Sequence, residues 1–265
     1  MAVIRVGTSG TSDQSPEKRL RLLCLHGHGG TPARLCSKLK DFFQSVLTTE
    51  DARTRTLGSS EARDVALAIE CRCIGAPLPE ASRREDGRQW WRYDENGMGD
   101  RPLDWAEMEV ATTKLADELW KAQESEEPID GVLGFSQGAE MVHTIALLKH
   151  QQDPRFQGLV SPSFVISLSG AVNPAHFESI SGGGPPQDLS ELYFGPGPRE
   201  VALPCLFVGD FVSDGWYSSQ RLSTTKDLYF DRTVVSHNQQ HTVPTLSGTQ
   251  SSNVRRFLSR FMRQR

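Results

Sequence analysis

The sequence predicts a single α/β domain in which helices cover both faces of a mostly parallel β-sheet. Short, continuous apolar runs are typical of strands that are buried on both faces. They alternate along nearly the whole chain with longer segments whose apolar residues recur at helical spacing, which is the order expected for βαβ units. Of the 265 residues, 37% are hydrophobic and 23% are charged. This composition provides enough apolar side chains for one sizeable core, and α/β domains of this length are common.

The first expected unit is a strand, a glycine turn and a helix. Residues 22–25 are a continuous apolar run that stops at His26 and Gly27, as expected for a buried strand. Thr31 is a plausible N-cap, and Pro32 occupies the first helical position that proline favours. The helix that follows has apolar residues at helical spacing: Leu35, Leu39, Phe42 and Val46.

The remaining elements follow from the same two patterns. Strands are expected at residues 65–74, 129–135, 164–168 and 203–208 and around 234–235. Helices are expected from about residue 105 to 119, at 137–149 and at 251–262. Residues 1–18 are polar and are expected to form a flexible tail before a domain of residues 19–265. The Gly/Pro-rich stretch 181–198 is expected to be a surface or site-lining loop.

Charge and hydropathy exclude several classes of partner. The formal net charge is -4, whereas a protein that binds a nucleic-acid duplex normally has a basic surplus. No apolar run approaches the length of a membrane span, and the N-terminus has no apolar signal region, so we expect a cytoplasmic protein without membrane or nucleic-acid partners.

The five cysteines indicate free, buried thiols. Their number is odd, and three of them lie within apolar runs: Cys24, Cys36 and Cys205. Cys71 and Cys73 are two apart, so on a strand they share a face, and no second Cys/His pair lies at zinc spacing. We therefore expect no metal and no cofactor.

Residues 134–138 read Gly-Phe-Ser-Gln-Gly. A G-x-S-x-G pattern between a buried strand and a helix is a nucleophile elbow, in which small flanking glycines allow a sharp turn that exposes the serine hydroxyl. The alternative is a glycine-rich turn with a chance serine. The apolar strand before the pattern and the helical run after it favour Ser136 as a nucleophile.

A serine nucleophile needs a base and an acid that orients the base. In this kind of fold the acid and the histidine follow the serine in that order. His241 is the expected base and His237 the competitor, because both follow the last expected strand. Asp214 is the expected acid and Asp210 the runner-up, which could instead cap its turn.

Acyl chemistry also needs donors for the developing oxyanion. The expected donors are the backbone N–H groups of Gln137 and His28. His28 lies in the glycine turn after the first strand, which contains Gly27, Gly29 and Gly30. This turn fits neither of the phosphate-binding patterns G-x-G-x-x-G and G-x-x-x-x-G-K-[ST]. Trp90, Trp91 and Trp216 are candidates for walls of a substrate pocket. Because adjacent residues point in different directions, we expect only one of Trp90 and Trp91 to face the site. The alternative is that both are core anchors.

Several segments together resemble the family of serine hydrolases that comprises the fungal FSH family and its ovarian-cancer-associated animal relatives, within the α/β-hydrolase superfamily. The matching segments are residues 23–27, 88–92, 134–139, 209–214 and 241–244. The resemblance implies an α/β-hydrolase fold and a triad of Ser136, Asp214 and His241. The sequence departs from the family pattern in two places. The loop that carries the expected acid, residues 209–214, is longer than usual, and Gln239-Gln240 stand where family members often have glycines before the histidine.

The expected function is hydrolysis of a small-molecule ester or thioester through an acyl-serine intermediate, as in the carboxylic ester and thioester hydrolases (EC 3.1). Some fungal members resemble thioesterases that release a polyketide from its synthase, which makes an acyl-carrier domain a candidate partner. A general carboxylesterase, an acyltransferase and a non-catalytic binding protein are the alternatives.

Overall fold

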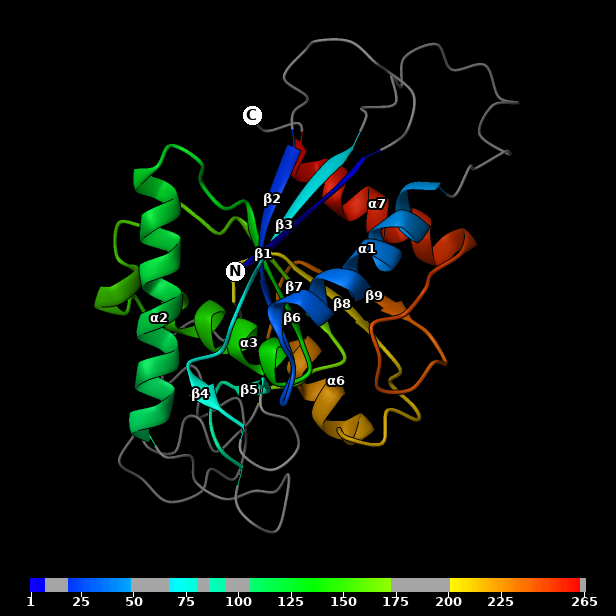
Figure 1. Ribbon diagram of the computed structural model, residues 1–265. Helices are drawn as coiled ribbons and strands as arrows, with labels where there is room; N and C mark the ends of the chain where they lie inside the picture. Colours follow the sequence, from blue (N-terminus) through cyan, green and yellow to red (C-terminus); the bar gives the residue numbers. More distant parts are fainter. Residues whose placement is uncertain (8–18, 49–66, 81–85, 94–104, 173–200, 263–265) are drawn as a thin grey trace.

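A seven-stranded sheet forms the centre of the molecule (Figure 1). The computed structural model describes residues 1–7, 19–48, 67–80, 86–93, 105–172 and 201–262. The strand order is β1-β3-β2-β6-β7-β8-β9. The bounds are β1 Ala2–Gly7, β2 Arg19–Leu25, β3 Ala68–Ile74, β6 Gly131–Phe135, β7 Phe164–Leu168, β8 Cys205–Gly209 and β9 Arg232–Ser236. Only β1 pairs antiparallel among these strands, so the predicted α/β-hydrolase fold with a mostly parallel sheet is confirmed.

Helices cover both faces of this sheet. The long helices are α1 Pro32–Thr48, α2 Trp105–Glu124, α3 Gln137–His150 and α7 Gly248–Met262. One core contains side chains of α1 and α7 and the other contains those of α2 and α3. Along β2 the side chains alternate between the two cores, since Leu22 and Cys24 enter the first while Leu23 and Leu25 enter the second. This double burial explains why the strands have continuous apolar sequences.

The shorter elements complete the chain around the sheet. They are β4 Leu78–Pro79, β5 Arg88–Gln89, the 3-10 turn Pro154–Phe156 and α6 Ser219–Asp227. None of them has an apolar run or a clear amphipathic pattern, and the sequence did not predict them. None of the helices in the described ranges combines the length and apolar character that crossing a bilayer requires.

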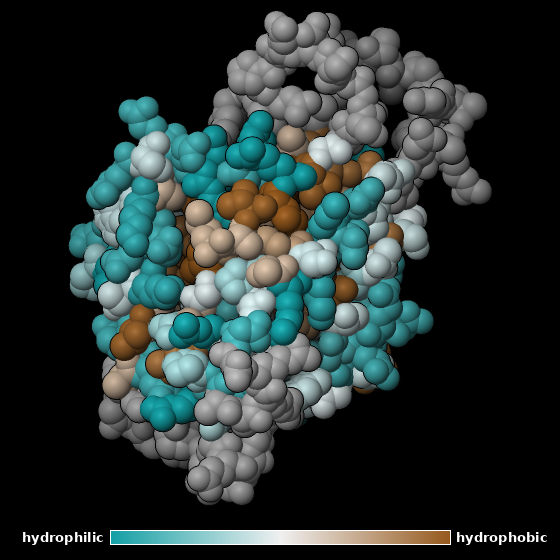
Figure 2. Space-filling model, in the orientation of Figure 1, coloured by the Kyte–Doolittle hydropathy of each residue, from teal (hydrophilic) through white to brown (hydrophobic). Residues whose placement is uncertain are grey.

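The N-terminal residues correct one expectation. Ala2–Gly7 is not part of a flexible tail but forms the edge strand β1, paired with β3. Ile4 and Val6 pack against the core beneath α1, while Arg5 extends outward and pairs with Glu70. Figure 2 shows hydrophobic side chains over this edge, framed by hydrophilic ones. The rest of the expected tail, residues 8–18, lies outside the described residues, as do residues 181–198.

All five cysteines are free and buried, as predicted. Four of them lie in the core beneath α1: Cys24, Cys36, Cys71 and Cys73. The Cys36 thiol donates to Cys73 Sγ over 2.7 Å. The C-x-C pair therefore has a packing role, with both side chains inside the protein.

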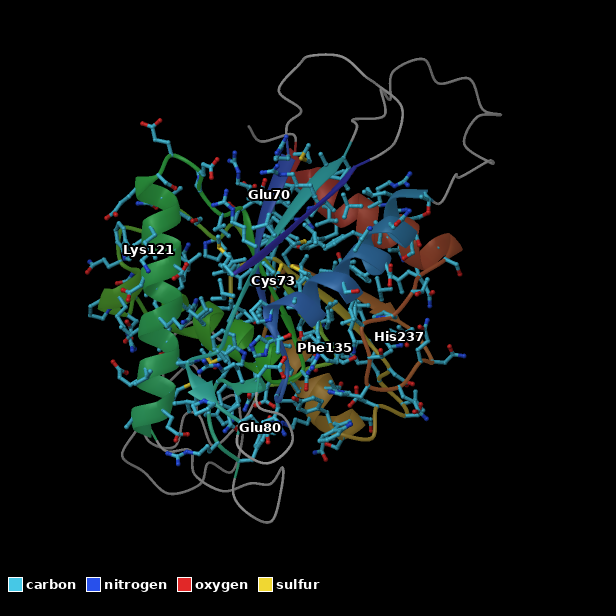
Figure 3. The ribbon with its side chains drawn as sticks, in the orientation of Figure 1. Glu70, Cys73, Glu80, Lys121, Phe135 and His237 are labelled. Atoms are coloured by element: carbon cyan, nitrogen blue, oxygen red, sulfur yellow. The ribbon has the colours of Figure 1, made fainter. Side chains whose placement is uncertain are left out.

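A buried carboxylate joins the three strands at this edge. Glu70 on β3 accepts hydrogen bonds from Arg5 on β1, Arg19 on β2 and Arg72 on its own strand. Burial alone would raise the pKa of Glu70, but the hydrogen bonds from Arg5 and Arg72 outweigh it and hold the pKa below its usual value. Figure 3 shows Glu70 far from Phe135, towards the opposite end of the sheet.

We expect Glu70→Gln to lower the free energy of unfolding by about 1–3 kcal/mol near pH 7, because it weakens hydrogen bonds to a charged group. A depressed pKa stabilises the fold above the ordinary carboxyl pKa, and this stabilisation is lost as the pH falls through the folded-state pKa. The difference between variant and wild type should therefore shrink in acid. Urea unfolding at several pH values measures it.

Glu127→Gln is the matched control. Glu127 also pairs with Arg72, but its side chain is 50% exposed whereas that of Glu70 is 4% exposed. The control should therefore lose less stability than Glu70→Gln. Equal losses in the two variants would contradict the role of Glu70 as the junction of the strands.

Candidate active site

The chain turns sharply at Ser136, between β6 and α3. Ser136 has φ 55° and ψ −122°, in a region that non-glycine residues rarely adopt. A Cβ on Gly134 would lie 2.1 Å from the carbonyl oxygen of Gly138, and one on Gly138 would lie 2.2 Å from that of Leu25. Only glycine fits at both positions, so the two glycines of the motif allow strand and helix to pass closely around the serine.

Three side chains from separate loops meet at this turn. Ser136 Oγ lies 2.8 Å from His241 Nε2, and His241 Nδ1 lies 3.0 Å from each carboxylate oxygen of Asp214. With its proton on Nδ1, the imidazole donates to Asp214 and accepts from the Ser136 hydroxyl. The Asp214 side chain is 1% exposed and that of His241 is 12% exposed, so the ion-pairing partner is shielded while the base remains accessible. This arrangement suits nucleophilic attack by the serine.

Asp210 makes a different set of contacts. Its carboxylate accepts from the Ser213 hydroxyl and from the backbone N–H groups of Val212, Ser213 and Gln240. These hydrogen bonds, led by that of the Ser213 hydroxyl, lower the pKa of Asp210 to about 2. Asp210 thus holds the turn that carries Asp214 and links it to the residue before His241.

His237 also lies in the loop that carries His241 but does not reach the serine. Its Nδ1 accepts from the backbone N–H of Gln239, and its burial lowers its pKa. Gln240 has φ 57°, where glycine is less strained. Gln239 and Gln240 stand where family members often have glycines. The Gln239 side chain stabilises this loop, because it bonds both the N–H and the carbonyl of Thr245.

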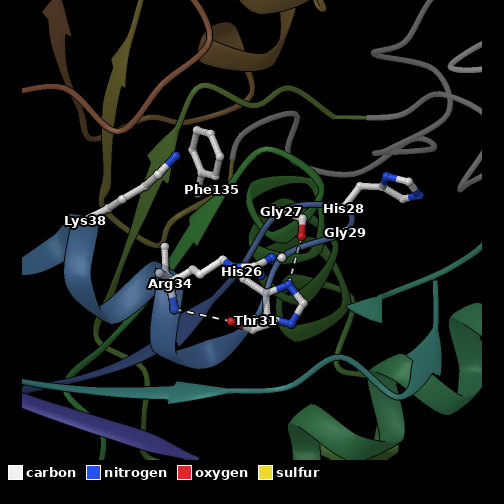
Figure 4. Close-up of a pocket in the computed structure, with 10 residues that line it drawn as sticks. His26, Gly27, His28, Gly29, Thr31, Arg34, Lys38 and Phe135 are labelled. Atoms are coloured by element: carbon white, nitrogen blue, oxygen red, sulfur yellow. Dashed lines mark hydrogen bonds between the residues drawn. The ribbon is translucent and has the colours of Figure 1, made fainter. Parts of the chain in front are cut away.

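The expected oxyanion donors belong to two neighbouring segments. The backbone N–H of Gln137 opens α3, and its side chain binds the backbone of Trp90 and Trp91. His28 lies in the glycine turn after β2, and its ring contacts the Gln89 side chain at 3.0 Å. Figure 4 shows the His28 ring directed away from the other residues of the turn.

The tryptophans separate into two groups. Trp90 and Trp91 are 0% and 1% exposed and belong to the core, and the Trp90 indole donates to the carbonyl of His26. The expectation that one of them faces the site is therefore wrong: both anchor the segment beneath the glycine turn. Trp216 is 49% exposed, and its ring centroid lies 5.4 Å from that of His241, so it borders the site.

Sequence reasoning missed a link between the nucleophile helix and the acid loop. The Tyr217 hydroxyl donates to Glu140 Oε1 over 2.6 Å, and its backbone N–H donates to Asp214. Glu140 lies one turn after Ser136 on α3, and the Tyr217 ring lies 5.8 Å from that of His241. The only sequence signal was that Glu140 and Tyr217 each lie close in sequence to a triad member. Nothing in the spacing shows that these two residues, which are 77 positions apart, come into contact.

Comparisons with known proteins find a matching family model and several curated relatives. The family model described as "Serine hydrolase (FSH1)" matches residues 15–252. An esterase of Caenorhabditis elegans, C25G4.2, is 27% identical over 157 residues, which are 59% of this chain and 62% of that protein. Esterase OVCA2 of Mus musculus is 26% identical over 199 residues, 70% of this chain and 79% of that protein. The match thus spans less than two thirds of the nematode relative.

Solved structures share the fold at low sequence identity. Acyl-protein thioesterase 2 of Zea mays superposes with a TM-score of 0.57 at 18% identity and covers 98% of this chain and 99% of its own. A carboxylesterase of Bacillus cereus gives a TM-score of 0.55 at 13% identity and covers 98% and 94%. At these identities the likeness shows an α/β-hydrolase fold.

We expect Tyr217→Phe to slow the reaction of Ser136 with a fluorophosphonate by about tenfold, because small displacements of catalytic groups cost up to about a hundredfold. The ring is retained, and only the hydrogen bond to Glu140 is lost. The variant should also lose about 1–3 kcal/mol of unfolding free energy. Labelling rates and urea unfolding measure the two effects.

Tyr229→Phe is the matched control for this substitution. The Tyr229 hydroxyl is bonded to the buried His143 on α3, two helical turns beyond Ser136. This variant should lose stability but keep the wild-type labelling rate. If both variants slow labelling equally, the link through Glu140 has no role in positioning the acid loop.

Proposed function

Because the chain belongs to the FSH1 serine hydrolase family, we propose that it hydrolyses a carboxylic ester or thioester through an acyl-serine intermediate. The observation that carries the proposal is the continuous chain of hydrogen bonds from Ser136 through His241 to Asp214 at a strained strand–helix turn. Such a turn is maintained against its strain only where the surrounding structure holds it, and strained residues of this kind cluster at active sites.

The reaction has two halves. The Ser136 hydroxyl attacks the acyl carbonyl while its proton passes to His241 Nε2. That proton then goes to the leaving alcohol or thiol as the bond to the acyl carbon breaks. In the second half, water gives a proton to His241 and attacks the acyl-serine, and His241 returns the proton to Ser136 as the acid leaves. Asp214 holds the imidazole tautomer and stabilises the imidazolium.

Backbone donors stabilise the oxyanion in both halves. We assign this role to the N–H groups of Gln137 and His28, since one follows the nucleophile and the other lies in the glycine turn beside it. Losing one such donor typically costs about a hundredfold to a thousandfold in rate. Trp216 is the proposed aromatic contact for the substrate beside His241.

Two classes of substrate compete within this proposal, thioesters and simple esters. The fold shared with an acyl-protein thioesterase favours a thioester. Such a thioester could be an acyl or polyketide chain attached to an acyl-carrier domain. Relatives named as esterases favour small esters instead. Turnover of a butyryl-carrier thioester without turnover of simple butyrate esters would select the first.

Fluorophosphonate labelling tests the triad directly. Ser136→Ala should abolish labelling of a folded protein. Asp214→Asn should slow it by about 10⁴-fold, because the wrong imidazole tautomer then faces the serine. Asp210→Asn, the matched control in the same loop, should lose far less. Labelling that persists in Ser136→Ala would refute the nucleophile, and absence of labelling in the folded wild type would favour a non-catalytic binding protein.

A further inference from the structure

A pocket of about 290 Å³ lies beside the nucleophile elbow (Figure 4). Its walls are the glycine turn of residues 26–30, the first turns of α1 and the Phe135 ring. Leu35 and Phe135 provide apolar surface, while Arg34 and Lys38 project from α1 at its margin. None of the described residues that line it is acidic. We refer to it as the Arg34–Lys38 pocket.

Two basic side chains stand at the margin of this pocket, and one buried carboxylate lies behind its glycine wall, with Glu80 Oε2 3.7 Å from the position of a Cβ on Gly29. Arg34 and Lys38 are four residues apart, so they lie on the same side of the helix. The ammonium group of Lys38 lies 5.3 Å from the centroid of the Phe135 ring, above an apolar surface. Arg34 pairs with Asp86 at 3.5 Å, but both side chains are well exposed, at 43% and 63%, so a bound anion competes easily for the guanidinium.

The backbone adds to this field. Helix α1 begins at Pro32 beside the pocket and has no acidic residue in its first turn. Thr31 caps this helix, because its hydroxyl accepts from the Arg34 N–H. The helix therefore contributes the positive end of its dipole, which favours a negative charge. Burial lowers the pKa of His26, so its imidazole is neutral near pH 7 and the positive charge of the pocket comes from the two α1 side chains.

The pocket lies against the segments that surround Ser136. A Cβ on Gly27 would lie 2.9 Å from the Cβ of Ser136, so the turn that forms one wall is packed against the nucleophile. The Phe135 ring, which forms another wall, lies 5.3 Å from the His241 ring. The pocket thus shares two walls with the surroundings of Ser136, although Ser136 and His241 are not among the residues that line it.

We propose that the Arg34–Lys38 pocket binds an anionic group, a carboxylate or a phosphate, carried by the substrate that Ser136 attacks. This inference rests on the proposed hydrolase function and names a substrate class within it. The substrate is then an ester or thioester with a negative charge near the reacting carbonyl, either on the acyl chain or on the leaving group.

Two matched substrate pairs test the pocket. 4-Nitrophenyl butyrate and the mono-4-nitrophenyl ester of glutaric acid differ in a carboxylate on the acyl chain. S-Ethyl thiobutyrate and S-butyryl-3-mercaptopropionate differ in a carboxylate on the leaving thiol. The wild type should prefer the anionic member of at least one pair in kcat/KM, and the pair concerned identifies the source of the charge. The preference should weaken as the salt concentration rises.

Lys38→Gln and Arg34→Gln should each reduce that anionic-to-neutral ratio by about fivefold, the upper range for one exposed ion pair. Lys38→Arg should restore it. Lys40→Gln is the matched control, because Lys40 is exposed on the same helix and does not line the pocket. A wild type with no anionic preference in either pair, or a ratio unchanged by both glutamine variants, would overturn the inference.

A failure of the proposed hydrolase function can be distinguished from a failure of the anion-binding proposal. If the wild type hydrolyses none of the four substrates, calorimetry with the glutarate monoester on Ser136→Ala still decides the pocket. Binding that weakens when Lys38→Gln is added supports the anion site without hydrolysis. Absence of binding, or binding unaffected by the second substitution, overturns it.

Discussion

The sharp turn at Ser136 is the constraint on which the rest of the site depends. Its backbone lies in a region that costs about 1–3 kcal/mol, and it persists because neighbouring groups hold it. The Ser136 N–H donates to the carbonyl of Leu168 on the adjacent strand, and the Ser136 carbonyl accepts from Ala139 and Glu140. Close contact with the end of β2 leaves the turn no room to relax. The strained backbone therefore exposes the Ser136 hydroxyl at the otherwise buried junction of β6 and α3.

The first turn of α3 also organises the segments around the nucleophile. Gln137 binds the backbone of Trp90 and Trp91, so the segment under the glycine turn is attached to the elbow. Glu140 binds Tyr217, so the acid loop is attached to the same helical turn. One turn of helix thus fixes the nucleophile relative to both the turn that would stabilise the oxyanion and the loop that orients the base. Polar side chains at buried helical positions are costly unless paired, and here each is paired across the site.

The sequence predicted those parts of the molecule that depend on local pattern. Buried parallel strands have continuous apolar runs, and an elbow requires glycines at fixed offsets, so the sheet and Ser136 could be read directly. The sequence favoured Asp214 over Asp210 but could not show which way the loop turns, and the loop turns by using Asp210 as its own hydrogen-bond acceptor. Trp90 was misjudged for a related reason, since burial depends on segments distant in the chain. The edge strand β1 was missed because six residues of alternating pattern are a weak signal beside a polar stretch.

The triad itself accepts any acyl group, because its geometry concerns only the carbonyl carbon, the proton and the leaving atom. Selectivity must therefore come from what borders it, and the two borders differ in chemistry. On the acid-loop side stands the half-exposed Trp216, which offers an aromatic surface. On the α1 side stand Arg34 and Lys38 around an apolar floor. A substrate that satisfies both borders has an apolar part that contacts the indole and a negative charge a short distance from the reacting carbonyl. Neutral esters of the same size would gain only the first contact, so under the proposed anion binding the α1 border would make the site selective for charged substrates.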